Sequence, residues 1–132
     1  LCTGNSCRSQ MAEGFGKKYL NNYFVKSAGT NPQKIHPLAI KVMEEIGINI
    51  SNHKSTLFTN DDLKENDMII TLCGSAKDEC IINNSPTIEF RHWNLNDPAD
   101  AKGSLEEKIN VFRKIRDQIE QKIKLLKSEI SS

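Results

Sequence analysis

The sequence predicts an α/β fold with a mostly parallel sheet. Two short strand signals, the apolar run 68–72 and the weaker segment 87–93, lie between segments whose apolar residues recur every three or four positions. The first run is continuously apolar, as expected of a parallel strand that is buried on both faces. Alternating helices and buried strands are typical of layered α/β domains, which bind ligands at the carboxyl ends of the strands.

In the first half of the chain we expect two helices and one strand. Apolar residues at positions i, i+4 and i+8 predict a helix over Gln10–Leu20, and the apolar run Tyr23–Ala28 predicts a strand. Pro37 fits the first turn of the second helix, because its ring fixes a helical φ and it has no N–H to satisfy. Gly47 is expected to end that helix.

In the second half, Thr59 is expected to cap a short helix that reaches Asn66. The strands over 68–72 and 87–93 follow. The sequence Ser104–Glu107 is a capping box, with serine at the cap and glutamate three residues later. It opens the segment with the clearest helical periodicity, which predicts a packing face. The apolar residues of that face are Leu105, Ile109, Phe112, Ile115, Ile119, Ile123 and Leu126.

Length and composition predict a single globular domain over residues 1–132. The net charge of +1 gives no electrostatic reason to expect nucleic acid or an anionic membrane as a partner. No apolar run reaches the roughly 20 residues of a membrane span, and no signal peptide is visible. We therefore expect a cytoplasmic protein, and a monomer. Because the cytosol keeps thiols reduced, its four cysteines are expected to do chemistry or bind metal.

The segment Cys2–Ser9, which we call the oxyanion loop, leads directly into the first predicted helix. A loop that wraps onto a helix N-terminus directs backbone N–H groups at a bound anion. Gly4 allows a tight turn, and the planar guanidinium of Arg8 can bind two oxygens of the anion. Cys2 would lie at the focus of this positive field, where a thiol ionises readily, and Ser9 could hydrogen-bond its sulfur. On spacing alone, a polar turn with a half-buried cysteine remains the alternative.

The whole string Cys-Thr-Gly-Asn-Ser-Cys-Arg-Ser-Gln-Met-Ala-Glu, residues 2–13, is far more specific. It resembles the low-molecular-weight tyrosine phosphatase superfamily, and within it the thioredoxin-coupled arsenate reductases. The resemblance covers nearly the whole chain. It continues through Ser27-Ala28-Gly29, Gly47 to His53, Thr71-Leu72-Cys73, His92-Trp93 and Asp97-Pro98.

The resemblance implies a three-layer fold, in which helices flank a four-stranded parallel sheet and the first strand runs into the oxyanion loop. That first strand has no counterpart before Cys2, and we expect that the sequence begins inside a longer chain. The resemblance also implies that Thr3, Gly4, Asn5, Ser6, Cys7, Arg8 and Ser9 bind the oxyanion. Asp97, which would otherwise read as a turn residue before proline, would be the general acid.

Cys73 and Cys80 distinguish a reductase from a phosphatase. Cys73 follows the buried strand 68–72, so it lies within disulfide reach of Cys2 if the first strand is its neighbour. The resemblance implies a relay in which Cys2 attacks arsenate, Cys73 forms a disulfide with Cys2, and Cys80 then forms one with Cys73. Thioredoxin would reduce that last disulfide. A bond between Cys73 and Cys80 requires the intervening segment to loop out, since a helix would hold their α-carbons about 10 Å apart.

Some of these reductases bind potassium through residues that match Asn5 and Glu13 and through a carboxylate after the Ser-Asn-His segment. Here Lys54 follows that segment, so we expect no bound cation and an ammonium group that offsets the charge of Glu13. No metal or other bound cofactor is expected. Trp93 is expected in the core. His53 is interpreted as a hydrogen-bonding partner within its loop, and His36 and His92 as surface or edge residues. Arg113 and Arg116 are expected on the solvated face of the last helix.

The function predicted from these features is arsenate reduction, with phosphate and sulfate as analogues of the substrate and weak phosphatase activity. The alternative enzyme is a low-molecular-weight tyrosine phosphatase. It is disfavoured because Ala99 and Asp100 stand where those phosphatases place aromatic residues. A third alternative is a thiol-based metal or redox sensor, although the cysteine spacings do not match those of structural zinc sites.

Overall fold

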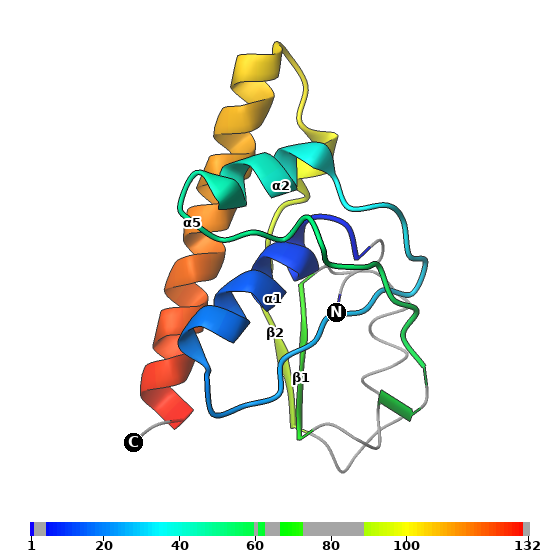
Figure 1. Ribbon diagram of the computed structural model, residues 1–132, viewed down its shortest axis with the longest axis vertical. Helices are drawn as coiled ribbons and strands as arrows, with labels where there is room; N and C mark the ends of the chain where they lie inside the picture. The colour runs from blue at the N-terminus through cyan, green and yellow to red at the C-terminus, as the bar shows by residue number, and fades with distance from the viewer. Residues whose placement is uncertain (2–4, 60, 63–66, 73–88, 131–132) are drawn as a thin grey trace.

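The computed structural model describes residues 1, 5–59, 61–62, 67–72 and 89–130. In chain order the elements are α1 (Arg8–Tyr19), α2 (Pro37–Glu44), β1 (Met68–Thr71), β2 (Glu89–His92), the 3₁₀ turn η1 (Pro98–Asp100) and α5 (Leu105–Ile130). Helices α1 and α2 both pack against α5, which runs along the whole molecule (Figure 1). None of the helices in the described ranges is long and apolar enough to cross a membrane.

The sheet of the described residues consists of β1 and β2, which pair in parallel with Met68 opposite Glu89 and Thr71 opposite His92. On the other side of β1, the N–H group of Leu1 donates to the carbonyl of Ile70 over 2.7 Å. The N–H of Leu72 donates to the carbonyl of Leu1 over 2.9 Å. These two bonds extend the parallel pattern across β1 and bring the chain start to the carboxyl end of this strand.

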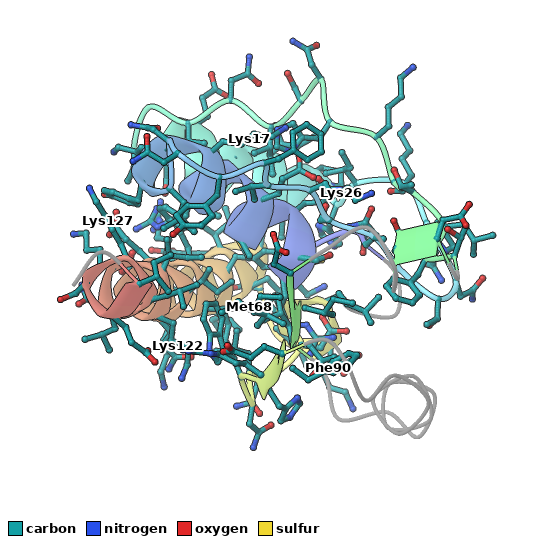
Figure 2. All side chains as sticks on the ribbon, turned by 90° about the horizontal axis from the view of Figure 1, so that it is seen from below. Lys17, Lys26, Met68, Phe90, Lys122 and Lys127 are labelled. Atoms are coloured by element: carbon teal, nitrogen blue, oxygen red, sulfur yellow. The ribbon has the colours of Figure 1, made fainter. Side chains whose placement is uncertain are left out.

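The core lies between α5, α1 and the sheet. Figure 2 looks at the molecule from below, with α5 to the left of β1 and β2 and Phe90 of β2 on the side of the strands away from α5. The predicted packing face of the last helix is confirmed from Ile109 to Leu126, whereas Leu105 is 63% exposed. The largest fully buried apolar side chains are Phe15, Phe112, Met11, Met43, Ile50, Leu72, Ile119 and Val42. Trp93 packs against this core but is only partly buried.

Two glycines allow α1 to lie unusually close to its neighbours. A Cβ atom at Gly16 would lie 2.7 Å from Cγ1 of Val25. A Cβ at Gly14 would lie 3.1 Å from methyl groups of Ile48, Ile50 and Met43. Glycine weakens a helix interior by about 1 kcal/mol relative to alanine, so α1 gives up intrinsic stability for close packing.

The predicted helices and strands are largely confirmed, with one clear exception. The expected strand over 23–28 does not form: a single bridge pairs Gly29 with Leu57, and Phe24 is 88% exposed. An apolar run becomes a strand only where a second strand lies alongside to pair with its backbone. At the expected short helix, the N–H of Thr59 donates to the carboxylate of Asp62, and Asp61 and Asp62 are helical, whereas residues 60 and 63–66 lie outside the described residues. The four-strand count of the expected sheet is likewise not tested.

Candidate functional site

The oxyanion loop enters α1 through Asn5, which has a left-handed backbone conformation with φ of 47°. Asparagine tolerates this conformation better than most residues, because its short polar side chain can bond locally. The side chain is fully buried. Its Nδ2 donates to the hydroxyls of Ser9 and Ser27, over 2.8 and 2.9 Å. Asn5 therefore fixes the loop to the first turn of α1 and to the segment before Gly29.

The oxygens of Asn5 are bonded as well. Its side-chain Oδ1 accepts from the backbone N–H of Thr56 at 2.9 Å and from Nε2 of Gln10 at 3.1 Å. Its backbone carbonyl accepts from Gln10 at 3.0 Å and from the hydroxyl of Ser55 at 3.1 Å. A buried amide with every polar atom bonded holds one conformation, because any rotation leaves a buried group unsatisfied.

The carboxylate of Glu13 closes this network into a ring. Oε1 of Glu13 accepts from the N–H of Ser27 at 2.9 Å and from its hydroxyl at 2.7 Å. Nδ1 of His53 lies 3.0 Å from Oε2 of Glu13 and 3.0 Å from Oε1 of Gln10. Both of these oxygens are acceptors, because Nε2 of Gln10 donates to Asn5, so Nδ1 carries a hydrogen. Hydrogen bonds thus run from Asn5 through Ser27, Glu13, His53 and Gln10 back to Asn5.

The charge of Glu13 is stabilised inside this ring. Burial by itself raises the pKa of Glu13, but hydrogen bonds from Lys17 and Ser27 and the nearby His53 outweigh it and hold the pKa below its usual value. Nζ of Lys17 lies 2.9 Å from Oε2. The pKa of His53 is also lowered, chiefly by burial, which the charge of Glu13 only partly offsets. At neutral pH the ring therefore contains a carboxylate and a neutral imidazole.

Arg8 links α1 to the carboxyl ends of both strands. Its Nη1 donates to the carbonyl of Leu72, which follows β1, at 3.2 Å and to the carbonyl of Leu95, which follows β2, at 2.9 Å. Its Nη2 lies 3.5 Å from Oδ2 of Asp97. Arg8 is 8% exposed. The guanidinium is therefore held by two carbonyls while Nε and Nη2 keep donors that could face an anion.

Asp97 lies at the start of η1, and its Oδ1 accepts from the N–H of Ala99 at 3.0 Å. This bond orients the carboxyl group while its other oxygen faces Arg8. Two predicted site residues that are 89 positions apart in the chain are thus neighbours in the structure. An arginine and a carboxyl group at the carboxyl ends of parallel strands could bind an oxyanion and supply a proton to it.

The rest of the predicted site is described only in part. Ser6 and Cys7 lie in the loop, and Cys7 precedes α1 and is 3% exposed. Ser9 lies in the first turn of α1. The predicted residues Cys2, Thr3, Gly4, Cys73 and Cys80 lie outside the described residues, as does the expected bond between Ser9 and the sulfur of Cys2.

Several network residues were not predicted from the sequence. Gln10, Ser55 and Thr56 read as ordinary polar positions, because a buried side chain that bonds a backbone carbonyl leaves no periodic pattern. Only Gln10 gave a sign in the sequence of a role in the network: it is a polar residue next to the apolar face of a helix, and in the structure it is fully buried. His53 was expected to bond within its own loop, but its partners are Gln10 and Glu13 on α1.

Three expectations need correction. The described cation beside Glu13 is Lys17, one turn along α1, and not Lys54, whose side chain is exposed. His36 is not a surface or edge residue: it is half-buried and caps α2. Arg116 does not lie on a solvated face, since it is 9% exposed and its Nη1 donates to the carbonyl of Val42 and to Glu45. Within the described ranges, no three side chains of the His, Cys, Asp or Glu type come together as metal ligands.

Comparison with known proteins adds independent information. The family described as low molecular weight phosphotyrosine protein phosphatase matches residues 1–132. An arsenate reductase of Halalkalibacterium halodurans is 50% identical over 125 residues, which cover 94% of this chain and 89% of the relative. The arsenate reductase of Bacillus subtilis is 46% identical over the same shares of the two chains.

A solved structure is similar over almost the whole chain. It is described as an arsenate reductase in the phosphate binding state, is 36% identical and has a TM-score of 0.79. The match covers 98% of this chain and 94% of that chain. The predicted low-molecular-weight phosphatase-like fold is therefore confirmed.

Proposed function

Because the chain belongs to the low molecular weight phosphotyrosine protein phosphatase family, and its relatives include arsenate reductases of 46% and 50% identity, we propose that it reduces arsenate to arsenite. The observation that carries the proposal is the contact of Arg8 with Asp97 at the carboxyl ends of β1 and β2. It joins a donor for oxyanion oxygens to a carboxyl group in one place. The other oxyanion ligands are backbone N–H groups of the loop from Thr3 to Ser9, which the bonded side chain of Asn5 holds in position.

In the first step the thiolate of Cys2 attacks arsenic. A sulfur–arsenic bond forms and an arsenic–oxygen bond breaks, and the departing oxygen takes a proton from Asp97 and leaves as water. Arg8 compensates the negative charge of the oxygens, through its Nε and Nη2 donors. The rigid ring around Asn5 keeps the loop in the required conformation before substrate arrives, so that binding does not have to order it.

In the second step the thiolate of Cys73 attacks the sulfur of Cys2. The sulfur–sulfur bond forms as the sulfur–arsenic bond breaks, and its electron pair remains on arsenic, which leaves as arsenite. Cys80 then attacks the sulfur of Cys73, which restores the thiolate of Cys2 and leaves a disulfide between Cys73 and Cys80. Thioredoxin supplies the two electrons and two protons that reduce this disulfide.

The pairing at Leu1 supports the second step. The N–H of Leu72 donates to the carbonyl of Leu1 over 2.9 Å. In the sequence, Cys2 directly follows Leu1 and Cys73 directly follows Leu72. The two segments are therefore joined by a backbone hydrogen bond directly before these cysteines. Neighbouring strands lie about 4.8 Å apart, so this pairing supports the expectation that the two thiols can reach one another.

The test is arsenite formation from arsenate with thioredoxin, thioredoxin reductase and NADPH, measured for the wild type and for Cys80→Ser. We expect repeated turnover by the wild type and at most one turnover by Cys80→Ser, because the mutant cannot transfer the disulfide to an exposed pair. A matched control is Cys7→Ser, which removes a loop thiol that has no step in the relay. It is expected to sustain repeated turnover.

Aryl phosphate hydrolysis, measured on the same preparations, distinguishes an arsenate reductase from the alternative, a tyrosine phosphatase. If the wild type forms no arsenite but hydrolyses an aryl phosphate briskly, the chain is a phosphatase and the roles proposed for Cys73 and Cys80 are wrong. Equal turnover by the wild type and Cys80→Ser would retain arsenate reduction but exclude the three-thiol relay. The expected cytoplasmic location and monomeric state accompany the proposal and need their own measurements.

A further inference from the structure

His36 touches both the oxyanion loop and the start of α2. Its backbone N–H donates to the carbonyl of Ser6 at 3.0 Å. Its own carbonyl accepts from Ala39 and Ile40 in the first turn of α2. Its ring Nδ1 accepts from the N–H of Leu38 at 3.1 Å, as the cap of the helix. One residue thereby fixes the helix start and a loop carbonyl.

This cap requires a neutral imidazole. Nδ1 can accept from Leu38 only while it carries no hydrogen, so the ring hydrogen is on Nε2. Serine, threonine, aspartate and asparagine are the usual cap residues, and none of them loses its acceptor oxygen in the same way on protonation near neutral pH. The cap of α2 therefore depends on pH in a manner that an asparagine cap would not.

The surroundings of the ring set its charge state. On α5, the ring of Phe112 lies 4.8 Å from that of His36, centroid to centroid, and Lys108 repels a proton. The loop before η1 contributes Asp97, which attracts one, and the neighbouring loop residue Ser6 is uncharged. Burial lowers the pKa of His36, and the attraction of Asp97 offsets this only in part. The ring is therefore neutral at neutral pH, and only acid can protonate it and remove the cap.

We propose that His36 is a positioning residue of the site, which holds the loop and α2 through its cap while its ring is neutral and gives up the cap when the ring is protonated. The proposal rests on the proposed function, since the oxyanion loop is taken as its anion-binding site. A proton on Nδ1 would point at the N–H of Leu38, and a cation is disfavoured at a helix N-terminus. Loss of the cap would free the start of α2 and, because the N–H of His36 bonds the carbonyl of Ser6, would also loosen the oxyanion loop.

The catalytic test compares the pH dependence of kcat for arsenite formation in the wild type and His36→Asn. Asparagine can accept the hydrogen bond from Leu38 but does not titrate. Relative to its own maximum, we expect His36→Asn to retain about threefold more kcat at pH 5.5 than the wild type. His36→Ala lacks both the cap and the titration, and its kcat should be lower at every pH. Recovery of kcat in His36→Asn would show that the cap, and not the imidazole itself, is needed at neutral pH.

A matched control is His92→Asn, which removes another histidine whose Nδ1 bonds the hydroxyl of Thr71. Its normalised pH profile should follow that of the wild type. Coincident normalised profiles for the wild type and His36→Asn would overturn the proposal. So would an equal displacement of the profile in His92→Asn.

A second measurement does not depend on turnover. The ring protons of His36 are titrated by NMR in the wild type and in Asp97→Asn. We expect the pKa of His36 to be lower in Asp97→Asn, because the charge that favours the imidazolium is gone. An unchanged pKa would contradict the inference even if the enzyme reduces arsenate. If no arsenite forms but the pKa falls as expected, the proposed function fails while the coupling of His36 to Asp97 stands.

Discussion

Arg8 and Arg116 are two buried arginines with similar surroundings and different consequences. They are 8% and 9% exposed, and each donates through Nη1 to a backbone carbonyl and lies beside a carboxylate. Arg116 joins α5 to α2, and its Nε is also bonded, to Asp117 at 2.9 Å. Arg8 joins α1 to the carboxyl ends of β1 and β2, and its Nη2 stands 3.5 Å from Asp97.

The difference shows that a buried arginine does not by itself mark a binding site. The guanidinium of Arg116 is occupied by partners from the two helices that it connects, so it has a structural role. Arg8 stands at a helix N-terminus beside a loop, where its remaining donors and the backbone dipoles favour the same negative ligand. Position in the fold, and not burial or pairing, separates the two arginines.

The difference between the two arginines is tested most directly by substituting each of them separately with lysine. Arg8→Lys keeps the charge but loses the planar fork, and kcat/KM for arsenate should fall by about 100-fold or more. Arg116→Lys should leave kcat/KM within about twofold, because its partners lie between α2 and α5. Steady-state kinetics of the two variants, with unfolding curves as a check on folding, decide the matter. Equal losses would mean that the arginines have the same role.

Asn5→Ala tests whether the loop is held by the buried ring. The substitution removes the partners of Ser9, Ser27 and Gln10 and forces alanine into a left-handed conformation. We expect a loss of about 2–3 kcal/mol in the free energy of unfolding, measured in urea. Asn5→Gly removes the same side-chain bonds without the backbone strain, so it should be about 1 kcal/mol more stable than Asn5→Ala. Two variants of equal stability would show that the backbone at Asn5 is not strained.

Arg116→Met is expected to affect stability alone. It leaves the carbonyl of Val42 without its donor, while Glu45 keeps Arg113, whose Nη2 lies 2.6 Å from its carboxylate. The expected loss is about 1–2 kcal/mol in the free energy of unfolding, with kcat/KM unchanged. Lys114→Met, an exposed position on the same helix, controls for the removal of a positive charge and should change stability by about 0.5 kcal/mol or less. Unfolding curves of the two variants that coincide would contradict a structural role for Arg116.

Glu13→Gln should have the smallest effect, and one that depends on pH. The pKa of Glu13 is lower in the folded protein than its ordinary value of 4.5, so its charge stabilises the fold above that value. This contribution is lost as the pH falls through the lowered pKa. We expect Glu13→Gln to be about 1 kcal/mol less stable than the wild type at pH 6.5, with the difference shrinking in acid. A stability difference that stays constant between pH 6.5 and pH 3.5 would exclude a charged Glu13 in the ring.

The contrast between the two arginines also explains what could be predicted from the sequence. Periodicity located α1, α2 and α5, because one buried face repeats along each helix, whereas β1 was located by a continuous apolar run and β2 by a weaker strand signal. The contact of Arg8 with Asp97 was anticipated only through resemblance to a family, since the fold alone brings these residues together. Arg116 was expected on the solvated face of the last helix, but it is buried. Its buried partner is the backbone carbonyl of Val42, and since every residue has a carbonyl, the sequence cannot reveal this bond.

The failure at residues 23–28 has a different cause. A strand forms only when it pairs with another strand. An apolar run shows that a segment is suited to a strand, but it does not show whether a partner strand is present. The ring of Asn5, Ser27, Glu13, His53 and Gln10 illustrates the same limit for side chains. Its members come from three segments of the chain, and no local pattern in the sequence links them.

The glycines of α1 bear on the order in which the molecule assembles. With Gly14 and Gly16 in its interior, this helix has little tendency to form before its neighbours are present. Helix α5, with 26 residues and no internal glycine, can nucleate early, whereas the oxyanion loop acquires its shape only when α1 docks. During folding the apparatus for binding an anion would thus arise late, after the scaffold. Substitutions in α1 should accordingly accelerate unfolding more than they slow folding, which stopped-flow measurements on Ala12→Gly would reveal.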